Sequence, residues 1–233
     1  MHPAAEQYRA LLERVDRWFA GAAERYPGVI PCRAGCSACC HGPFDISIAD
    51  ALLLGEGLKT LSPADRAVVR SRGERLLARM RQQAPAWLAP WDLRDLGETA
   101  FDNLAESLAD EPCPLLDDQG RCRVYQWRPL VCRLIGLPMM TAEGELLENA
   151  CPIQDQFPEY ARLDPQLFDL DALQDAEVSA LEAAAKELRG ESSSGTSRPP
   201  SPPWRRRSPT GEGGGVGVCR AFRCGSRRLP VFS

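Results

Sequence analysis

The stretch "CRAGCSACCHGPFDIS", residues 32–47, places four cysteines within nine positions. Spacings as short as C-x3-C-x2-C let one loop surround a metal centre, because three thiolates converge without long-range folding. Small residues such as Gly35 and Ala38 permit the tight turns that this requires. Cys39 and Cys40 are adjacent, and consecutive side chains of an extended chain point to opposite faces. The pair therefore favours two different centres, or one centre and its surroundings.

Further cysteines follow along the chain, which has ten in all. The candidate metal ligands are Cys32, Cys36, Cys39, Cys40, Cys113, Cys122, Cys132 and Cys151. This number of thiols suffices for two four-sulfur sites, or for one site with spare cysteines. Buried structural thiols, which behave as small hydrophobes, are the alternative, but they explain a dense cluster poorly. His41 is either one more ligand in the loop or a solvated, hydrogen-bonded histidine.

The composition is that of a soluble globular protein, with 233 residues, 44% of them hydrophobic and 26% charged. No apolar run is long enough to span a membrane, so no membrane partner is expected. Residues 1–18 carry charges where a signal peptide needs an apolar stretch, which predicts a cytoplasmic location. In that reducing compartment a dense set of cysteines indicates metal binding or redox chemistry rather than structural disulfides.

The charge is distributed unevenly along the chain. Residues 190–233 hold eight Arg and two Glu, a net charge of +6, so a total of −4 leaves −10 for residues 1–189. An acidic body of this kind argues against nucleic-acid binding. The Ser, Pro, Gly and Arg composition predicts that residues 190–233 form a disordered basic tail. We therefore predict a cysteine-cluster metal-binding domain over residues 1–189, with its motif core at residues 30–152.

Periodicity and capping signals predict a mainly helical α+β fold, in which small hairpins and loops are organised around a cysteine-ligated metal site. Helices are expected at about residues 4–25, after the Ser47–Asp50 capping box, at 62–83, at about 96–109 and at 171–188. The helix at 62–83 is expected to bury Val68, Val69, Leu76, Leu77 and Met80. Turns at Asp117–Gly120 and near Gly144 predict two hairpins. The first would bring Cys113 and Cys122 together, and the second would deliver Cys151.

The residues after the loop continue a recognisable pattern. They read Cys113-Pro114-Leu115-Leu116, Gly120, Cys122, Tyr125, Arg128-Pro129, Cys132-Arg133 and Cys151-Pro152. Together with the loop, this pattern resembles the YkgJ-like cysteine-cluster family, the CxxCxxCC proteins. Its hallmark is a C-x2/3-C-x2-C-C element followed by C-P-x-L and C-x-x-Y-x-x-R-P-x-x-C-R. The resemblance covers about residues 30–152, with both halves in order.

What the resemblance implies is binding of zinc or iron, and for some family members an iron–sulfur cluster. One branch of the family includes flagellin lysine N-methylases. This chain is short and shows no extra catalytic domain, so that activity is not transferred to it. Arg128 and Arg133 are candidate cofactor-binding residues, because their N–H groups could bond to thiolate or sulfide and offset its charge. The alternative is that both arginines bond to carbonyl oxygens or acidic neighbours.

Three functional hypotheses follow. The first is a metal-binding protein whose cofactor is an iron–sulfur cluster or zinc. The second is an iron–sulfur enzyme of redox or protein-lysine methyl-transfer type. The third is a structural zinc module that binds a protein partner. His2 and His41 are the only histidines, which gives a Ser-His-Asp hydrolase little support. All-thiolate tetrahedral sites suit both zinc and iron, so the cysteines alone do not choose between them.

Overall fold

Helices make up most of the regular structure in the computed structural model, which describes residues 3–33, 35–89, 91–147, 149–169, 172–173, 175–179 and 182. The α-helices are α1 (Pro3–Ala23), α2 (Ile48–Thr60), α3 (Pro63–Gln83), α4 (Leu93–Leu96), α5 (Glu98–Ser107) and α6 (Val131–Leu134). Short 3₁₀ turns are η1 (Tyr125–Trp127), η2 (Gln154–Gln156) and η3 (Tyr160–Arg162), and the strands are β1 (Met139–Met140) and β2 (Gln166–Leu167). The predicted mainly helical α+β class is confirmed for these residues.

Helices α2 and α3 begin at the capping residues that the sequence identifies. The Ser47 hydroxyl accepts the Asp50 N–H at 3.1 Å, and the Asp50 carboxylate accepts the Ser47 N–H at 3.4 Å. Ser62 caps α3 in the same way, with Pro63 at its first position. Side-chain caps satisfy N–H groups that have no partner within the helix, which explains why both starts are set locally. The predicted burial of Val68 in α3 is wrong, since this side chain is 38% exposed.

The helix predicted at about residues 96–109 is present as α5, and Gly97 separates it from the short helix α4. This glycine has φ +84°, a conformation that other residues adopt rarely, and it ends α4 and precedes α5. The helix predicted at 171–188 is present at residues 172–173, 175–179 and 182. The rest of that helix and the predicted tail at 190–233 lie outside the described residues, so the domain boundary stays a prediction.

Both predicted hairpins are present. In the first, the Asp117 N–H donates to the Arg121 carbonyl at 2.8 Å, and Leu116 and Cys122 form an antiparallel bridge. In the second, the Leu147 N–H donates to the Met139 carbonyl at 2.9 Å around a turn that includes Gly144. Strand β1 also pairs in parallel with β2, a pairing that the sequence does not predict.

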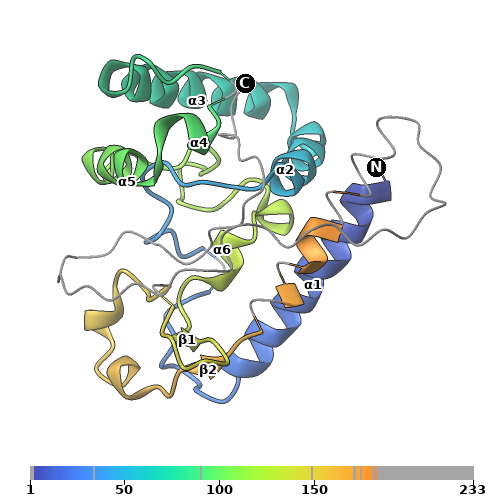
Figure 1. The fold of residues 1–233 in the computed structure, drawn as a ribbon, viewed down its shortest axis with the longest axis vertical. Helices are drawn as coiled ribbons and strands as arrows, with labels where there is room; N and C mark the ends of the chain where they lie inside the picture. The colour runs from blue at the N-terminus through green and yellow to red at the C-terminus, as the bar shows by residue number, and fades with distance from the viewer. Residues whose placement is uncertain are drawn as a thin grey trace.

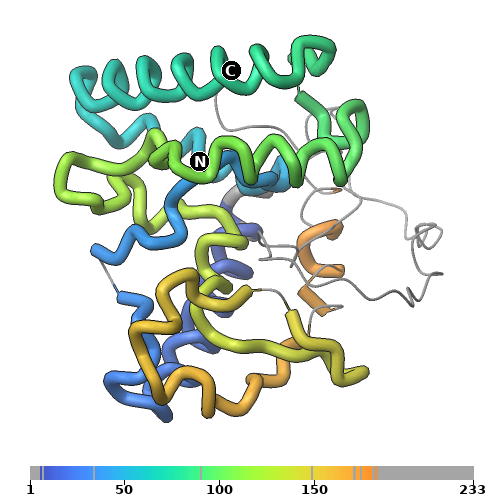
Figure 2. Tube along the Cα trace, turned by 90° about the vertical axis from the view of Figure 1, so that its left-hand side faces the viewer, coloured from blue at the N-terminus to red at the C-terminus, as the bar shows by residue number. Residues whose placement is uncertain are grey.

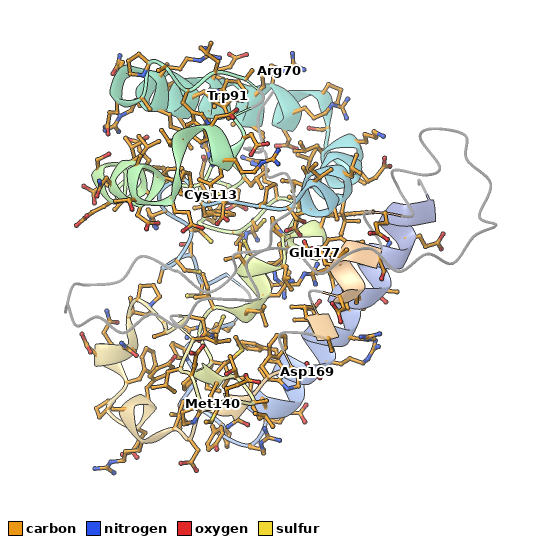
Figure 3. All side chains as sticks on the ribbon, viewed as in Figure 1. Arg70, Trp91, Cys113, Met140, Asp169 and Glu177 are labelled. Carbon is orange, nitrogen blue, oxygen red and sulfur yellow. The ribbon has the colours of Figure 1, made fainter. Side chains whose placement is uncertain are left out.

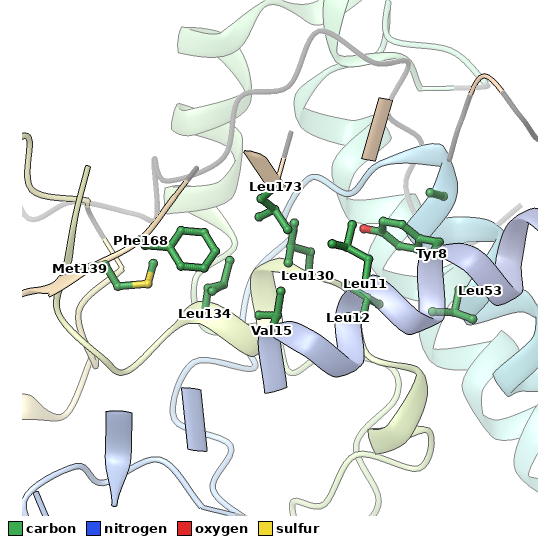
Figure 4. Packing of buried hydrophobic residues seen from close by; sticks show 11 residues of the cluster. Tyr8, Leu11, Leu12, Val15, Leu53, Leu130, Leu134, Met139, Phe168 and Leu173 are labelled. Carbon is green, nitrogen blue, oxygen red and sulfur yellow. The ribbon is translucent and has the colours of Figure 1, made fainter. Parts of the chain in front are cut away.

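The helices form an upper and a lower part (Figure 1). Helix α3 lies over α5 as an upper layer (Figure 2), and a core that includes Leu77, Trp87 and Leu108 joins them. Helix α1 packs against α2 and α6, and Leu12, Val15 and Leu134 belong to the core that they share (Figure 4). Among the described helices, none has both the length and the apolar character of a membrane span. The cysteine-bearing segments connect these two parts.

Candidate metal centre

The cysteine-rich loop and the first hairpin are joined through their main chains. The Cys113 N–H donates to the Cys40 carbonyl at 2.9 Å, and the Gly42 N–H donates to the Glu111 carbonyl at 2.7 Å. His41 and Pro112 form an antiparallel bridge between these bonds. The loop therefore lies directly beside the residues that lead into the hairpin, and Cys113 follows this junction.

Three cysteines belong to the segment of the first hairpin and α6, and we call Cys113, Cys122 and Cys132 the Cys113 group. The hairpin brings Cys113 and Cys122 to one side of an apolar cluster around Leu54 and Leu115. Burial, followed by the charges on Cys122 and Cys39, raises the pKa of Cys113 to about 11, although the Leu115 amide lowers it. Burial and the charges on Cys113 and Cys39 raise the pKa of Cys132 well above its ordinary value.

A second set, Cys32, Cys36 and Cys151, comes from the loop and from the end of the second hairpin, and we call it the Cys151 group. Although Cys32 is exposed at the surface, partial desolvation of its thiol, followed by the charges on Cys39, Cys36 and Cys151, raises its pKa to about 11. The pKa of Cys151 is also raised, mainly by burial, with contributions from the charges on Cys36 and Cys39. The structure thus brings Cys151 to the first cysteines of the loop, whereas the sequence links it only to the second hairpin.

Cys39 is common to both groups. Its charge contributes to the raised pKa of Cys32 and Cys151 in one group, and of Cys113 and Cys132 in the other. A hydrogen bond with the Cys40 thiol, followed by burial, raises the pKa of Cys39 itself. A thiolate at Cys39 would therefore oppose the ionisation of members of both groups. Figure 3 shows Cys113 in the upper part of the molecule and Met140, of the second hairpin, at the bottom.

A tight turn at residues 134–137 supports Cys32. Gly136 has φ +104°, and a Cβ atom there would lie 3.1 Å from the Cβ of Cys32 and 3.4 Å from its Sγ. The Asn149 side chain fixes this turn by donating to the carbonyls of Leu134 and Leu137, at 2.6 Å each. Asn149 is 1% exposed, and its Oδ1 atom has no hydrogen-bond partner among the described residues. No motif identifies Asn149 in the sequence, although it lies only two positions before Cys151.

The two candidate arginines share Asp16 of α1 as their ion-pair partner. Arg133 also donates to the carbonyls of Arg128 and Gln126, at 3.0 and 2.9 Å. Arg128 lies 4.1 Å above the Tyr125 ring. These contacts agree with the alternative interpretation, in which the arginines bond to carbonyl oxygens and to an acidic residue. The positive charge on Arg128 nevertheless lowers the pKa of Cys32 and Cys122 against the effect of burial, so it acts on both cysteine groups. A role of either arginine in binding a cofactor stays a prediction.

The donor set has the chemistry of a zinc or iron site. All eight cysteines of the described part are free thiols. Thiolate sulfur is the ligand that structural zinc and iron–sulfur clusters share. Within the described ranges, no three Cys, His, Asp or Glu side chains converge closely enough to hold one ion. The thiols therefore fit zinc or iron by type, without a closed set of ligands among the described residues.

Comparison with known proteins agrees with this chemistry. The family model described as "CxxCxxCC: Putative zinc- or iron-chelating domain" matches residues 31–152, more than half of the chain. The chain belongs to this family. The matched range contains both cysteine groups, Cys39, Cys40 and the two arginines. No curated protein and no solved structure matches the chain. Family membership supports metal binding by this domain in general.

Proposed function

We propose that this chain is a metal-binding protein that holds zinc or iron through thiolates from its two cysteine groups. The observation that carries the proposal is the main-chain junction between Cys40 and Cys113, which joins the loop to the first hairpin in a domain whose described cysteines are all free thiols. A thiol must lose its proton to bind a metal, so binding here releases protons that burial retains. The metal in turn compensates the charge of neighbouring thiolates that would otherwise repel one another.

Of the two cofactors, an iron–sulfur cluster agrees better with the origin of the ligands. The thiols come from the loop, the first hairpin, α6 and the residues after the second hairpin. A compact zinc ribbon instead uses paired C-x2-C knuckles, and only Cys36 and Cys39 have that spacing. Zinc is the second candidate on the strength of that one knuckle. The enzymatic and partner-binding hypotheses stay predictions.

The test is anaerobic purification, followed by an absorbance spectrum and elemental analysis for iron, sulfide and zinc. Iron with acid-labile sulfide and a broad band near about 400 nm would establish a cluster. Zinc without visible absorbance would establish the second candidate. A correctly folded protein that binds neither metal, even after reconstitution, would contradict the proposal.

Two substitutions test whether both groups contribute. Cys36→Ser changes the Cys151 group, and Cys122→Ser changes the Cys113 group. We expect each to lower the metal content and to cause soluble aggregation, because a thiolate-bound metal stabilises the fold that holds it. Cys224→Ser, at a position outside the matched range, is the control. Normal metal content and melting temperature in both variants would show that the two groups do not share in the site.

A further inference from the structure

Cys151 is enclosed by side chains that lie outside the family match at residues 31–152. Cys151 is 4% exposed and packs with Tyr160 and Leu163. The partly buried residues around them are Tyr26, Val29, Ile30, Ile153 and Phe157. All of these neighbours either precede or follow the matched range. The apolar wall around this cysteine is therefore a feature of this chain that the family motif does not specify.

Tyr160 is the polar group in this wall that reaches the cysteine. Its hydroxyl oxygen accepts the Cys151 N–H at 3.2 Å, and the residue is 4% exposed. The turns η2 and η3 carry the chain back toward Cys151, and the Tyr160 N–H donates to the Phe157 carbonyl at 2.8 Å within this return. A phenol that accepts one hydrogen bond still has its own O–H to donate. The hydroxyl of Tyr160 thus holds the cysteine backbone and retains a hydrogen to offer.

The hydroxyl contacts Cys151 through its amide, and the thiols of Cys151 and Cys32 are ionisable groups that act on it. Burial raises the pKa of Tyr160, and the charges on Cys151 and Cys32 raise it further, against a lowering by the Cys151 amide. A phenol ordinarily has a pKa of about 10, so its O–H is present at neutral pH. A thiolate at Cys151, enclosed by apolar side chains, lacks water as a hydrogen-bond donor, which makes a protein donor valuable to it.

We propose that Tyr160 is a positioning residue of the metal centre, whose hydroxyl holds the Cys151 amide and donates to a thiolate of Cys151 or Cys32 when the metal is bound. The inference rests on the proposed function. It extends the centre beyond the family match, to a residue that no cysteine motif includes. Partners that orient and hydrogen-bond to metal ligands commonly change metal affinity by about 10–100-fold.

The test compares Tyr160→Phe with Tyr26→Phe. Both substitutions remove one hydroxyl from the same apolar cluster, but the Tyr26 hydroxyl accepts from the Gln166 side chain at 3.4 Å and not from a cysteine. Cobalt(II) titrated into metal-free protein under anaerobic conditions is the probe, because its charge-transfer bands report thiolate bonds. The two variants are also compared with the metal that the purified protein contains. For zinc, a competing chelator measures the affinity. For an iron–sulfur cluster, the position of the absorbance band near about 400 nm is measured.

We expect Tyr160→Phe to weaken metal binding by about 10–100-fold and to move the thiolate-to-metal band to longer wavelength. The band moves because a thiolate that has lost a hydrogen bond gives up its electrons more readily. Tyr26→Phe should change neither quantity. Leu163→Ala, which opens the same wall but keeps the hydroxyl, should lower the melting temperature without moving the band.

The outcomes separate this inference from the proposed function. If the wild-type protein binds metal and Tyr160→Phe matches Tyr26→Phe in affinity and spectrum, the inference is wrong while the function stands. The inference is also wrong if Leu163→Ala moves the band as far as Tyr160→Phe does, since packing would then explain both shifts. If the wild-type protein binds no cobalt, zinc or iron, the proposed function itself fails.

Discussion

The two cysteine groups are built in different ways. In the Cys113 group, the hairpin that contains Cys113 and Cys122 leads through η1 directly to α6 and Cys132. In the Cys151 group, by contrast, Cys32 and Cys151 share no helix or hairpin, and the turn at residues 134–137 and Asn149 bring support from elsewhere. Turns between residues close in the chain thus place the Cys113 group, whereas contacts between distant residues place the Cys151 group.

The supports of the two groups also differ in kind. Helix α3 holds the first hairpin through charged pairs, since Arg72 donates to Asp118 at 2.8 Å and Arg123 pairs with Asp65. Both groups also pack against apolar side chains, and the Cys151 group has in addition a buried amide nearby, Asn149. Exposed ion pairs contribute little and weaken with salt, whereas buried hydrogen bonds are costly to break. We therefore expect substitutions near the Cys151 group to have larger effects on stability.

The largest effect should come from Cys39→Ser, because this thiol is common to both groups. We expect metal affinity to fall by at least about 100-fold, with metal content reduced well below that of wild type. Cys40→Ser, which changes the adjacent thiol and keeps Cys39, should cost less. Elemental analysis after anaerobic purification measures both variants. Equal metal content in Cys39→Ser and wild type would show that Cys39 is not a ligand shared by the two groups.

Asn149→Leu should be next in size. The Leu134 and Leu137 carbonyls would lose their buried donors, which we expect to lower the free energy of unfolding of metal-free protein by about 2–4 kcal/mol. Urea denaturation measures this change. Asn103→Leu, at an exposed position of α5, is the control and should change stability by less than about 0.5 kcal/mol. Similar losses in the two variants would show that the turn beside Cys32 does not depend on Asn149.

The pH dependence of metal-free protein tests the burial of the thiols. The pKa of Cys113 is about 11 in the folded protein, against an ordinary 9.0. A raised thiol pKa adds stability that is fully present below about pH 9 and is lost as the pH rises through about 11. This loss is at most about 2.7 kcal/mol for the thiol, and contact with solvent reduces it. Urea denaturation at increasing pH should show it, and Cys113→Ser should lose less. Identical slopes for the two proteins would contradict the burial of this thiol.

Gly57→Ala tests the packing beside the Cys113 group. A Cβ atom at Gly57 would lie 2.6 Å from Cγ of Trp127, whose ring must then move away from α2. We expect a loss of about 1–2 kcal/mol in the free energy of unfolding. Gly55→Ala in the same helix meets nothing within 4 Å and should gain about 0.5–1 kcal/mol. Thermal melts that rank the two variants in the opposite order would refute the contact.

The smallest effect should come from Asp118→Asn, which breaks the exposed ion pair with Arg72. We expect a change below about 1 kcal/mol that disappears at high salt. Urea denaturation at low and high ionic strength measures it. A larger, salt-independent loss would mean that the Cys113 group relies on this pair as strongly as the Cys151 group relies on Asn149.

What could be predicted from the sequence follows the same division. The starts of α2 and α3 depend on side chains that bond three residues ahead, at Ser47 and Ser62, so a short window contains the whole signal. The turn at Asp117–Gly120 is equally local. These predictions are confirmed because few distant contacts could override them.

Other features depend on residues that are far apart in the chain. The β1–β2 pairing joins two-residue strands, which are too short to show an alternating pattern. Tyr160 and Asn149 acquire their roles only when the fold brings them to Cys151 and to the turn at residues 134–137. The short helix α4 before Gly97 is not predicted, because four residues are too few to show a helical period.

The main-chain pairing between residues 40–42 and 111–113 has a consequence for how quickly a metal enters and leaves. These hydrogen bonds use amide and carbonyl groups alone, so they persist whether or not any sulfur is ligated. Cys40 and Cys113 therefore stay aligned in metal-free protein, and folding has already met the entropic cost of bringing their segments together. For these two thiols, an incoming ion would meet segments that are already adjacent, and side-chain rotations take only picoseconds to nanoseconds. We expect loading of the folded apoprotein to be limited by ion dehydration and thiol deprotonation, with the amide of Cys113 protected from hydrogen exchange before the metal arrives.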